Sequence, residues 1–275
     1  MPKIQTSIFI LALLVCTVAY AAESDTPQKG NTHSSDAGVT VPVSIMYTQR
    51  AISGGFEVDP SGMTSGRATT ESLGLDKATA IQFAVAVNWK KWNFGFTYLP
   101  STFTGEGYSE ERLDFEDGNY IEPDIKVRTD ISVELYLGSV LYNFLNWKGL
   151  ELGAGFGAGS AKYDLEIIPR LGPGGLQSDG TTPFGYLSFN AVWRYKKFLL
   201  GGRVDALEVN ISGETVGYKD LNLMAGYRMP YKKIPINILA GYRWNSLDLT
   251  FDDGSSKFGM DIELKGPYMG VNAVF

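Results

Sequence analysis

The sequence contains almost no histidine or cysteine, and both shortages exclude chemistry. Its 275 residues include one histidine, His33, and one cysteine, Cys16. General-base catalysis near neutral pH favours histidine because the imidazole pKa lies in that range. A metal site built from histidine and cysteine is excluded by the same count. We therefore expect no catalytic residue, no bound metal and no cofactor.

The chain also lacks a long apolar run and an excess of basic residues. Beyond residues 8–18, no apolar stretch approaches the roughly 18 residues of a membrane-spanning helix. Lys and Arg number 24 against 30 Asp and Glu, a formal net charge of −6. No basic stripe is available for phosphates, so no nucleic-acid partner is expected. If the chain crosses a membrane, it does so as a closed barrel, because only helices and closed barrels satisfy every backbone group in hydrocarbon.

The N-terminus has the pattern of a secretory signal. Lys3 supplies a positive charge, residues 8–18 form an apolar run, and Ala19-Tyr20-Ala21 is an A-x-A cleavage site. We expect residues 1–21 to be removed as a signal peptide. Removal of the single Lys3 changes the formal net charge from −6 to −7.

The same cleavage removes Cys16 and leaves a polar start to the mature chain. Val15 is not the small residue that a lipoprotein signal places before its cysteine, so we expect no lipidation. Residues 22–37 hold His33 and no large apolar side chain, which is typical of a disordered leader. Residues 38–275 remain as one large domain.

Apolar residues alternate with polar or small ones over most of this domain, which predicts strands with two different faces. In one example, Ile81 and Phe83 flank Gln82. The predicted strands cover residues 39–48, 81–89, 92–98, 127–137, 150–159, 187–195, 198–206, 221–229, 234–244 and 260–275. Pro42 is unfavourable within the first, because proline removes a ladder hydrogen bond. The apolar positions change phase at Gly266-Pro267, which we interpret as a β-bulge.

Four short connections repeat one pattern, with lysine at the tip and aromatic or apolar residues on either side. They span residues 89–92, 146–150, 195–198 and 231–234, and their lysines are Lys90, Lys91, Lys148, Lys196, Lys197, Lys232 and Lys233. Tight turns flanked by rings are typical of the periplasmic rim of a membrane barrel, where aromatic residues mark the membrane boundary.

The other five connections are predicted to be long and polar. They cover about 51–77, 100–125, 164–183, 208–218 and 247–257. Short turns on one rim and long loops on the other favour an all-β, closed, antiparallel up-and-down transmembrane barrel. The count is about ten strands, with eight or twelve possible, since a further hairpin could lie within 51–77. A secreted soluble β-protein is the less favoured alternative.

The A-x-A signal, the alternating strands and a terminal Phe275 preceded by apolar residues at every second position resemble bacterial outer-membrane β-barrel proteins. Residues 73–76, 94–99 and 148–153 look, more loosely, like small uncharacterised barrels of Gram-negative bacteria. The resemblance implies an outer-membrane location, with lipids and lipopolysaccharide as surroundings. It also implies that the barrel-assembly machinery recognises the C-terminal strand. Ala273 departs from the pattern, in which a larger residue is commoner.

Charged residues on the expected inner faces of the strands carry both signs. Two interpretations fit them: a charged constriction that selects a solute, or a network of ion pairs that fills a narrow barrel. The second is favoured. The residues are Arg128, Asp130, Glu134, Glu151, Arg194, Arg203, Asp205, Arg228, Arg243, Asp261 and Glu263.

Two further features are open to a functional or a structural interpretation. Gly153, Gly155, Gly157 and Gly159 form a bare inner stripe, which either makes room for a solute or accommodates long side chains from other strands. Residues 106–124 are strongly acidic with interleaved aromatic residues. This segment could bind a cationic or protein ligand, or divalent cations, but a solvated surface loop is favoured.

These observations predict a non-enzymatic outer-membrane barrel with an envelope-structural role or a surface ligand-binding role through its long acidic loops. A narrow, porin-like solute channel with a mixed-charge lumen is the alternative. An enzyme using only carboxylates or lysine is the least favoured. The extracellular ligand cannot be named from the sequence.

Overall fold

The computed structural model describes residues 38–60, 66–114, 120–170, 175–211, 214–229, 234–252 and 256–275. The expected signal peptide (1–21) and leader (22–37) lie outside these residues, as do Lys232 and Lys233. Within the described part of the chain, no helix is long and apolar enough to cross a membrane.

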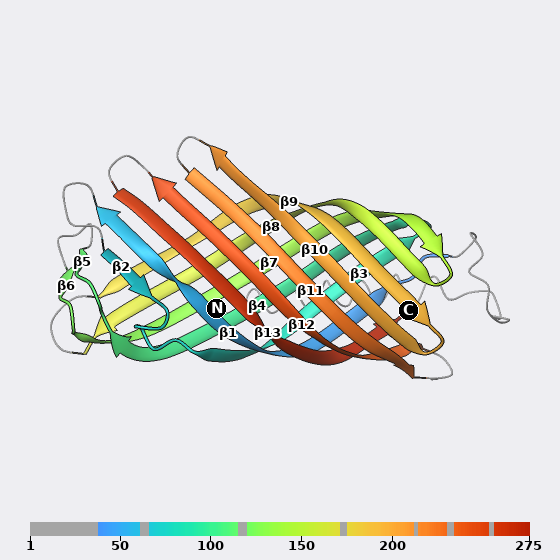
Figure 1. Cartoon of the computed structure of the whole chain (residues 1–275), viewed down its shortest axis with the longest axis horizontal. Coiled ribbons are helices and arrows are strands. Elements are labelled where there is room, and N and C mark those ends of the chain that lie inside the picture. Colours follow the sequence, from blue (N-terminus) through green and yellow to red (C-terminus); the bar gives the residue numbers. More distant parts are fainter. Residues whose placement is uncertain are drawn as a thin grey trace.

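Ten long antiparallel strands of the described residues close into a barrel (Figure 1), each pairing with its neighbour and β13 pairing with β1. This confirms the predicted fold class and strand count. The barrel strands are β1 (Pro42–Pro60), β3 (Lys77–Trp89), β4 (Trp92–Tyr108), β7 (Lys126–Trp147), β8 (Leu150–Pro169), β9 (Leu176–Tyr195), β10 (Phe198–Ile211), β11 (Glu214–Met229), β12 (Ile236–Asp252) and β13 (Ser256–Val274). Pro42 is the first residue of β1, a position at which proline is tolerated.

Short elements complete the outer end of the barrel. β2 (Gly66–Thr69) pairs with the end of β1, so the connection at 51–77 contains a short extra strand that leaves the barrel ten-stranded. Beyond β2, the amide of Tyr108 donates to the carbonyl of Ser72 over 2.8 Å, which attaches this connection to the end of β4. β5 (Leu113–Asp114) and β6 (Tyr120–Ile121) form a separate two-stranded sheet at the same end (Figure 1).

Three lysine turns have the geometry of tight hairpins. Lys90, Lys148 and Lys196 have φ values of 57°, 48° and 54°, as expected of turns that match the twist of the flanking strands. Each ammonium lies over the ring of the preceding Trp89, Trp147 or Tyr195, at 5.2, 4.9 and 5.2 Å from the centroid. These cation–π contacts place the charges beside the aromatic girdle at this rim.

Partway along the barrel, the inner and outer faces of the strands exchange polarity. On β4, Phe94 and Phe96 face outward near the lysine turns, while Gly95 lies on the inner face. Further along the same strand the outer positions are polar, and Leu99 and Phe103 are buried inside with at most 1% exposed. The barrel is therefore apolar outside and polar inside at one end, and the reverse at the other.

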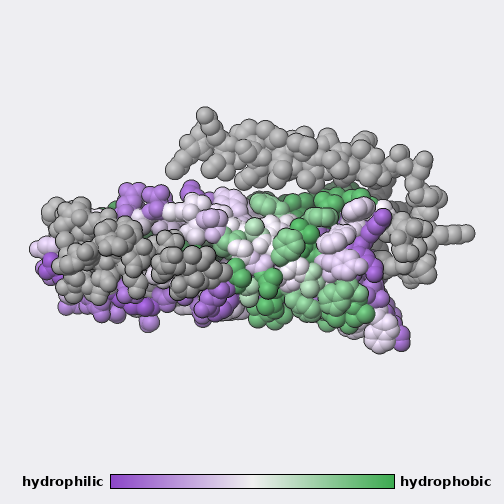
Figure 2. Space-filling view, turned by 90° about the horizontal axis from the view of Figure 1, so that it is seen from above, coloured by the Kyte–Doolittle hydropathy of each residue, from purple (hydrophilic) through white to green (hydrophobic). Residues whose placement is uncertain are grey.

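Outward apolar side chains gather toward the end with the lysine turns, as the visible face in Figure 2 shows, and we call them the belt. It includes Ile45, Tyr47, Phe83, Phe94, Phe96, Tyr142, Phe156, Leu187, Phe189, Leu200, Leu223, Ile238, Met269 and Val271, each more than a third exposed. Such a surface has the chemistry of a lipid-facing wall. We call the rest of the barrel, beyond this belt, the extramembrane half.

Strand lengths agree with this division. β7, β8 and β9 have 22, 20 and 20 residues, about twice the roughly 9–11 residues that a membrane strand needs. The expectation of five long polar loops is therefore wrong in extent, because most of those residues form strands. Their outer faces are polar, since they face water rather than lipid.

The prediction of a β-bulge at Gly266-Pro267 is wrong. The pairing of β13 with β12 runs without a shift, with Arg243 opposite Gly266 and Tyr242 opposite Pro267. Leu264 points inward and Met269 outward, so the apolar positions change phase where the surroundings change from water to lipid.

The belt and the extramembrane half can be compared on one face of β8. Phe156 lies in the belt, and Asp164 points outward beyond it. We expect Phe156→Lys to lower the free energy of unfolding by about 2–4 kcal/mol, because a charge is placed against lipid. Asp164→Lys should change it by less than about 0.5 kcal/mol. Urea unfolding in lipid vesicles measures both, and equal losses would contradict the proposed boundary.

Candidate functional site

The lumen of the extramembrane half is filled by apolar side chains. Ile131, Leu165, Leu249 and Ile262 are at most 2% exposed and come from β7, β8, β12 and β13. Leu73, from the connection between β2 and β3, belongs to the same cluster. Because these side chains meet from around the barrel, they pack against one another as the core of a soluble protein does.

An aromatic layer and an ionic cluster lie beneath this core. The ring of Tyr218 packs against Phe184 at 4.6 Å and Tyr186 at 5.6 Å between centroids. Next along the strands, Nε of Arg243 donates to Oδ1 of Asp220 at 3.0 Å, and Nη2 of Arg243 donates to Oδ2. Bidentate ion pairs of this kind are stronger than hydrogen bonds between neutral groups.

A second buried pair lies beside the first. Nε of Arg203 is 2.9 Å from both oxygens of Asp205, and the hydroxyl of Ser188 also donates to Asp205. Asp205 is 1% exposed, so this pair is screened from solvent. The predicted network of ion pairs is therefore present at Arg203, Asp205 and Arg243.

Arg50 adds a third guanidinium without a carboxylate of its own. It is 1% exposed, and its Nη1 donates to the hydroxyl of Ser101 at 3.3 Å. Its Nη2 and the side-chain amides of Gln82 and Asn245 have no hydrogen-bond partner among the described residues. Buried polar groups of this kind are normally satisfied by ordered water.

Five charged residues expected in the lumen lie instead on the outer face of the extramembrane half. Arg128 and Asp130 pair there at 3.0 Å with side chains 55% and 30% exposed. Asp261 pairs with Arg67 at 2.9 Å, and its side chain is 53% exposed. The other two are Glu134 and Glu263. The reason is the exchange of faces, which turns Val127 and Ile262 inward and these charges toward water.

The glycine stripe of β8 faces inward and makes room for aromatic rings. A Cβ atom at Gly157 would overlap the ring of Tyr186, and one at Gly159 would overlap the ring of Phe184. Both rings come from the neighbouring strand β9. The interpretation as a space for long side chains, rather than for a solute, therefore fits the structure.

The remaining predicted lumen residues lie at the mouth with the lysine turns. Glu151 pairs with Arg194, and Arg228 lies opposite Asn237 on the next strand. A cavity of about 380 Å³ opens here, lined by these four residues together with Lys197 and Asn146 among others.

The acidic segment at the opposite rim is partly neutralised. Glu106 accepts from Lys126 at 3.2 Å and from Arg170. The hydrogen bond from Lys126 makes the largest contribution to lowering the pKa of Glu106, and the hydrogen bond from Arg170 lowers this pKa further. Glu110, Glu122 and Asp124 are exposed. The predicted residues 115–119 lie outside the described residues.

The outer wall of the extramembrane half carries a second acidic group. Partial burial raises the pKa of Asp248, and the nearby carboxylates of Asp261 and Glu208 raise it further. No set of three or more potential ligands for a metal occurs among the described residues.

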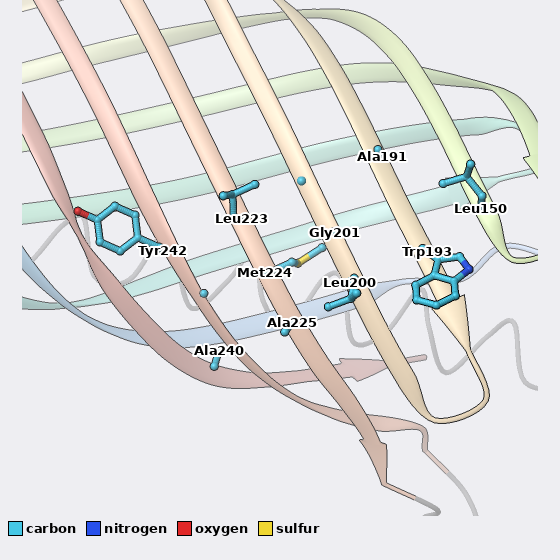
Figure 3. Close-up of a pocket in the computed structure, with 12 residues that line it drawn as sticks. Leu150, Ala191, Trp193, Leu200, Gly201, Leu223, Met224, Ala225, Ala240 and Tyr242 are labelled. Atoms are coloured by element: carbon cyan, nitrogen blue, oxygen red, sulfur yellow. The ribbon is translucent and has the colours of Figure 1, made fainter.

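A shallow depression lies on the outer wall within the apolar belt (Figure 3). Its volume is about 600 Å³. Trp193, Leu200, Leu223 and Tyr242 surround it, and small residues of β9 to β12 form its floor. It faces the surroundings of the barrel and has no link to the ionic cluster in the lumen.

Sequence reasoning missed Arg50 and Asp220, which belong to the ionic cluster. Both continue a polar face that the sequence shows. Asp220 is two residues before the inward Asn222 of β11, and Arg50 is two residues after the inward Thr48 of β1. Both residues would have been predicted if the alternating polar positions had been continued by two more residues along each strand.

No family model matches the chain, and no curated protein matches it in sequence. Solved structures of several bacterial outer-membrane proteins match the chain at low identity. The outer-membrane protease OmpT of Escherichia coli is 13% identical, with 85% of this chain and 97% of OmpT covered and a TM-score of 0.47. OprG of Pseudomonas aeruginosa is 11% identical, with 87% and 96% covered and a TM-score of 0.37. Neisserial surface protein A is 12% identical, with 86% and 96% covered and a TM-score of 0.32.

The burial of the ionic cluster predicts that replacing two different aspartates lowers the free energy of unfolding by different amounts. Asp220→Ala leaves the charge of Arg243 buried without a partner, and we expect a loss of about 3–5 kcal/mol in the free energy of unfolding. Asp130→Ala, which breaks the exposed pair with Arg128, should cost less than about 1 kcal/mol. Urea titration followed by tryptophan fluorescence compares them. A similar loss in both variants would show that the two pairs do not differ in burial.

Proposed function

We propose that the protein is a closed, non-enzymatic barrel of the outer membrane that displays a binding surface on its extramembrane half. The observation that carries this proposal is the filled lumen. Apolar side chains occupy the extramembrane half, and ion pairs and aromatic rings lie below them. A barrel of about this size has an interior that side chains can fill. The channel alternative has less support, because no polar route through the apolar core is apparent among the described residues.

Conductance distinguishes the closed barrel from a channel. We expect purified protein in planar lipid bilayers to give no steady open events, since ions would have to cross the apolar core. A water-filled porin reconstituted in parallel is the positive control. Steady single-channel steps from this protein, absent from a preparation unfolded before reconstitution, would contradict the closed barrel.

The exposed acidic residues beside β5 and β6 are the proposed binding surface. The amide of Asp124 donates to the carbonyl of Ser109 over 2.8 Å, which brings Asp124 beside the residue that precedes Glu110. The guanidinium of Arg112 lies 4.1 Å from the ring centroid of Tyr120 within the same group. Carboxylates held next to an aromatic ring suit a cationic ligand, such as a basic peptide.

This surface predicts charge-dependent binding of a basic peptide. Fluorescent deca-lysine should bind the protein in nanodiscs. Combined replacement Glu110→Gln, Glu122→Gln and Asp124→Asn should weaken binding about tenfold, which corresponds to about 1.4 kcal/mol. The matched control replaces Asp164, Glu166 and Asp179 on the outer wall with their amides. If both triple variants weaken binding equally, net charge rather than this surface is responsible.

The surroundings and the assembly route follow from the belt and the last strand. We propose that membrane lipids and lipopolysaccharide contact the belt, and that the barrel-assembly machinery recognises β13. Phe275 is 45% exposed, at the same end as the lysine turns, and its amide donates to the carbonyl of Val41 at 3.1 Å.

Deletion of Phe275 tests the assembly proposal. We expect a several-fold lower level of folded, heat-modifiable protein in the outer membrane, because the exposed terminal ring would be absent from the recognised strand. Electrophoresis of unheated membranes measures this level. Deletion of one residue in the leader is the control, and normal insertion without Phe275 would refute the role.

A further inference from the structure

The mouth with the lysine turns contains a cavity that the proposed surface function does not use. It has a volume of about 380 Å³ and is lined by the ends of the six consecutive strands from β7 to β12 and by adjoining turns. The side chains of Glu151, Arg194 and Arg228 lie on the inner faces of their strands. The lumen is filled above this cavity by the aromatic and apolar side chains described earlier, and we call the cavity the cup.

The cup carries an excess of positive charge. Its lining contains Arg194, Arg228, Lys196 and Lys197 against the single carboxylate of Glu151. Glu151 forms an ion pair with Arg194. Lys196 lies over the ring of Tyr195 on the outer side. Arg228 and Lys197 are therefore the cations available to a ligand inside the cup.

Two amide side chains, those of Asn146 and Asn237, also line the cup. Nδ2 of Asn237, which lies opposite Arg228, donates to Oδ1 of Asn272 at 2.9 Å. Deeper in the barrel, Asn143 and Asn190 flank Gly153, and their side-chain oxygens are buried without a hydrogen-bond partner among the described residues. Whichever way each amide is turned, it offers an unused donor or acceptor.

We propose that this cup binds a small hydroxylated anion from the periplasm, such as a sugar acid or a sugar phosphate. Arg228 and Lys197 would hold the carboxylate or phosphate, and the amides would pair with hydroxyl groups. The volume is at the small end of ligand cavities, which suits a single sugar ring. A lipid headgroup fits less well, because the groups concerned face the lumen and the outer wall at this height is aromatic.

Binding of matched sugars to the protein in phosphatidylcholine nanodiscs tests the proposal. The probes are glucuronate, glucose 6-phosphate and neutral glucose, measured by isothermal titration calorimetry. We expect saturable binding of at least one anionic probe, and at least tenfold weaker binding of glucose. No binding of either anion up to about 10 mM, a very weak affinity, would overturn the proposal, as would equal binding of glucose.

Variants of one position separate the cup from general surface charge. Arg228→Gln should weaken binding of the anion about tenfold or more. Arg228→Lys should recover part of the affinity, because it keeps the charge but loses the planar fork of donors. Lys91→Gln makes the same charge change in a turn outside the cup and should alter the affinity by less than twofold. Equal losses in Arg228→Gln and Lys91→Gln would overturn the proposal.

A change of lipid separates the two sources of anion. Nanodiscs that contain phosphatidylglycerol should leave the affinity for the sugar anion within about twofold at constant salt. Competitive loss of sugar binding as phosphatidylglycerol increases would assign the cup to a lipid headgroup and overturn the proposal. The deca-lysine experiment concerns the opposite rim, so either result stands without the other.

Discussion

The structure depends on one constraint: the long strands pass from lipid into water without interruption. The outer face must be apolar where it meets lipid and polar where it meets water. The inner face changes in the opposite sense, because the end that loses its apolar exterior gains an apolar core. β4 carries Phe94 and Phe96 outside at one end and Leu99 and Phe103 inside at the other.

The interior follows from this exchange. The extramembrane half is held together by apolar burial, as a soluble barrel is. The part within the belt gains no such stabilisation from its outward apolar side chains, because these side chains face lipid. It is filled instead by paired charges, aromatic rings and amides, among which Asp220 and Arg243 form the most buried ion pair. Within the belt every strand pairs with both neighbours, which leaves no unpaired edge against lipid. Beyond the belt, β9 and β10 pair only as far as Leu187 and Ala206.

The sequence was sufficient for the all-β barrel, the strand count, the three lysine turns within the described residues and the inward position of Arg203, Asp205 and Arg243. It was insufficient for the side on which Arg128 and Asp261 lie. Alternation with a period of two shows that two faces differ, but it does not show which face is outside. The apolar face was assumed to be external throughout, which holds only within the belt. The phase change at Gly266-Pro267 was the visible sign of the boundary.

The apolar core of the extramembrane half makes the two ends of one barrel respond to different solvents. Urea and heat act on burial from water, and so they act first on the side chains around Leu165 and Leu249. Detergent and bilayer thickness act on the belt around Phe156 and Leu223. The strands connect the two regions mechanically, so loosening of either end is transmitted along continuous hydrogen-bonded ladders to the other. A change in the lipid can therefore alter the stability of the extramembrane half, although lipid does not contact it.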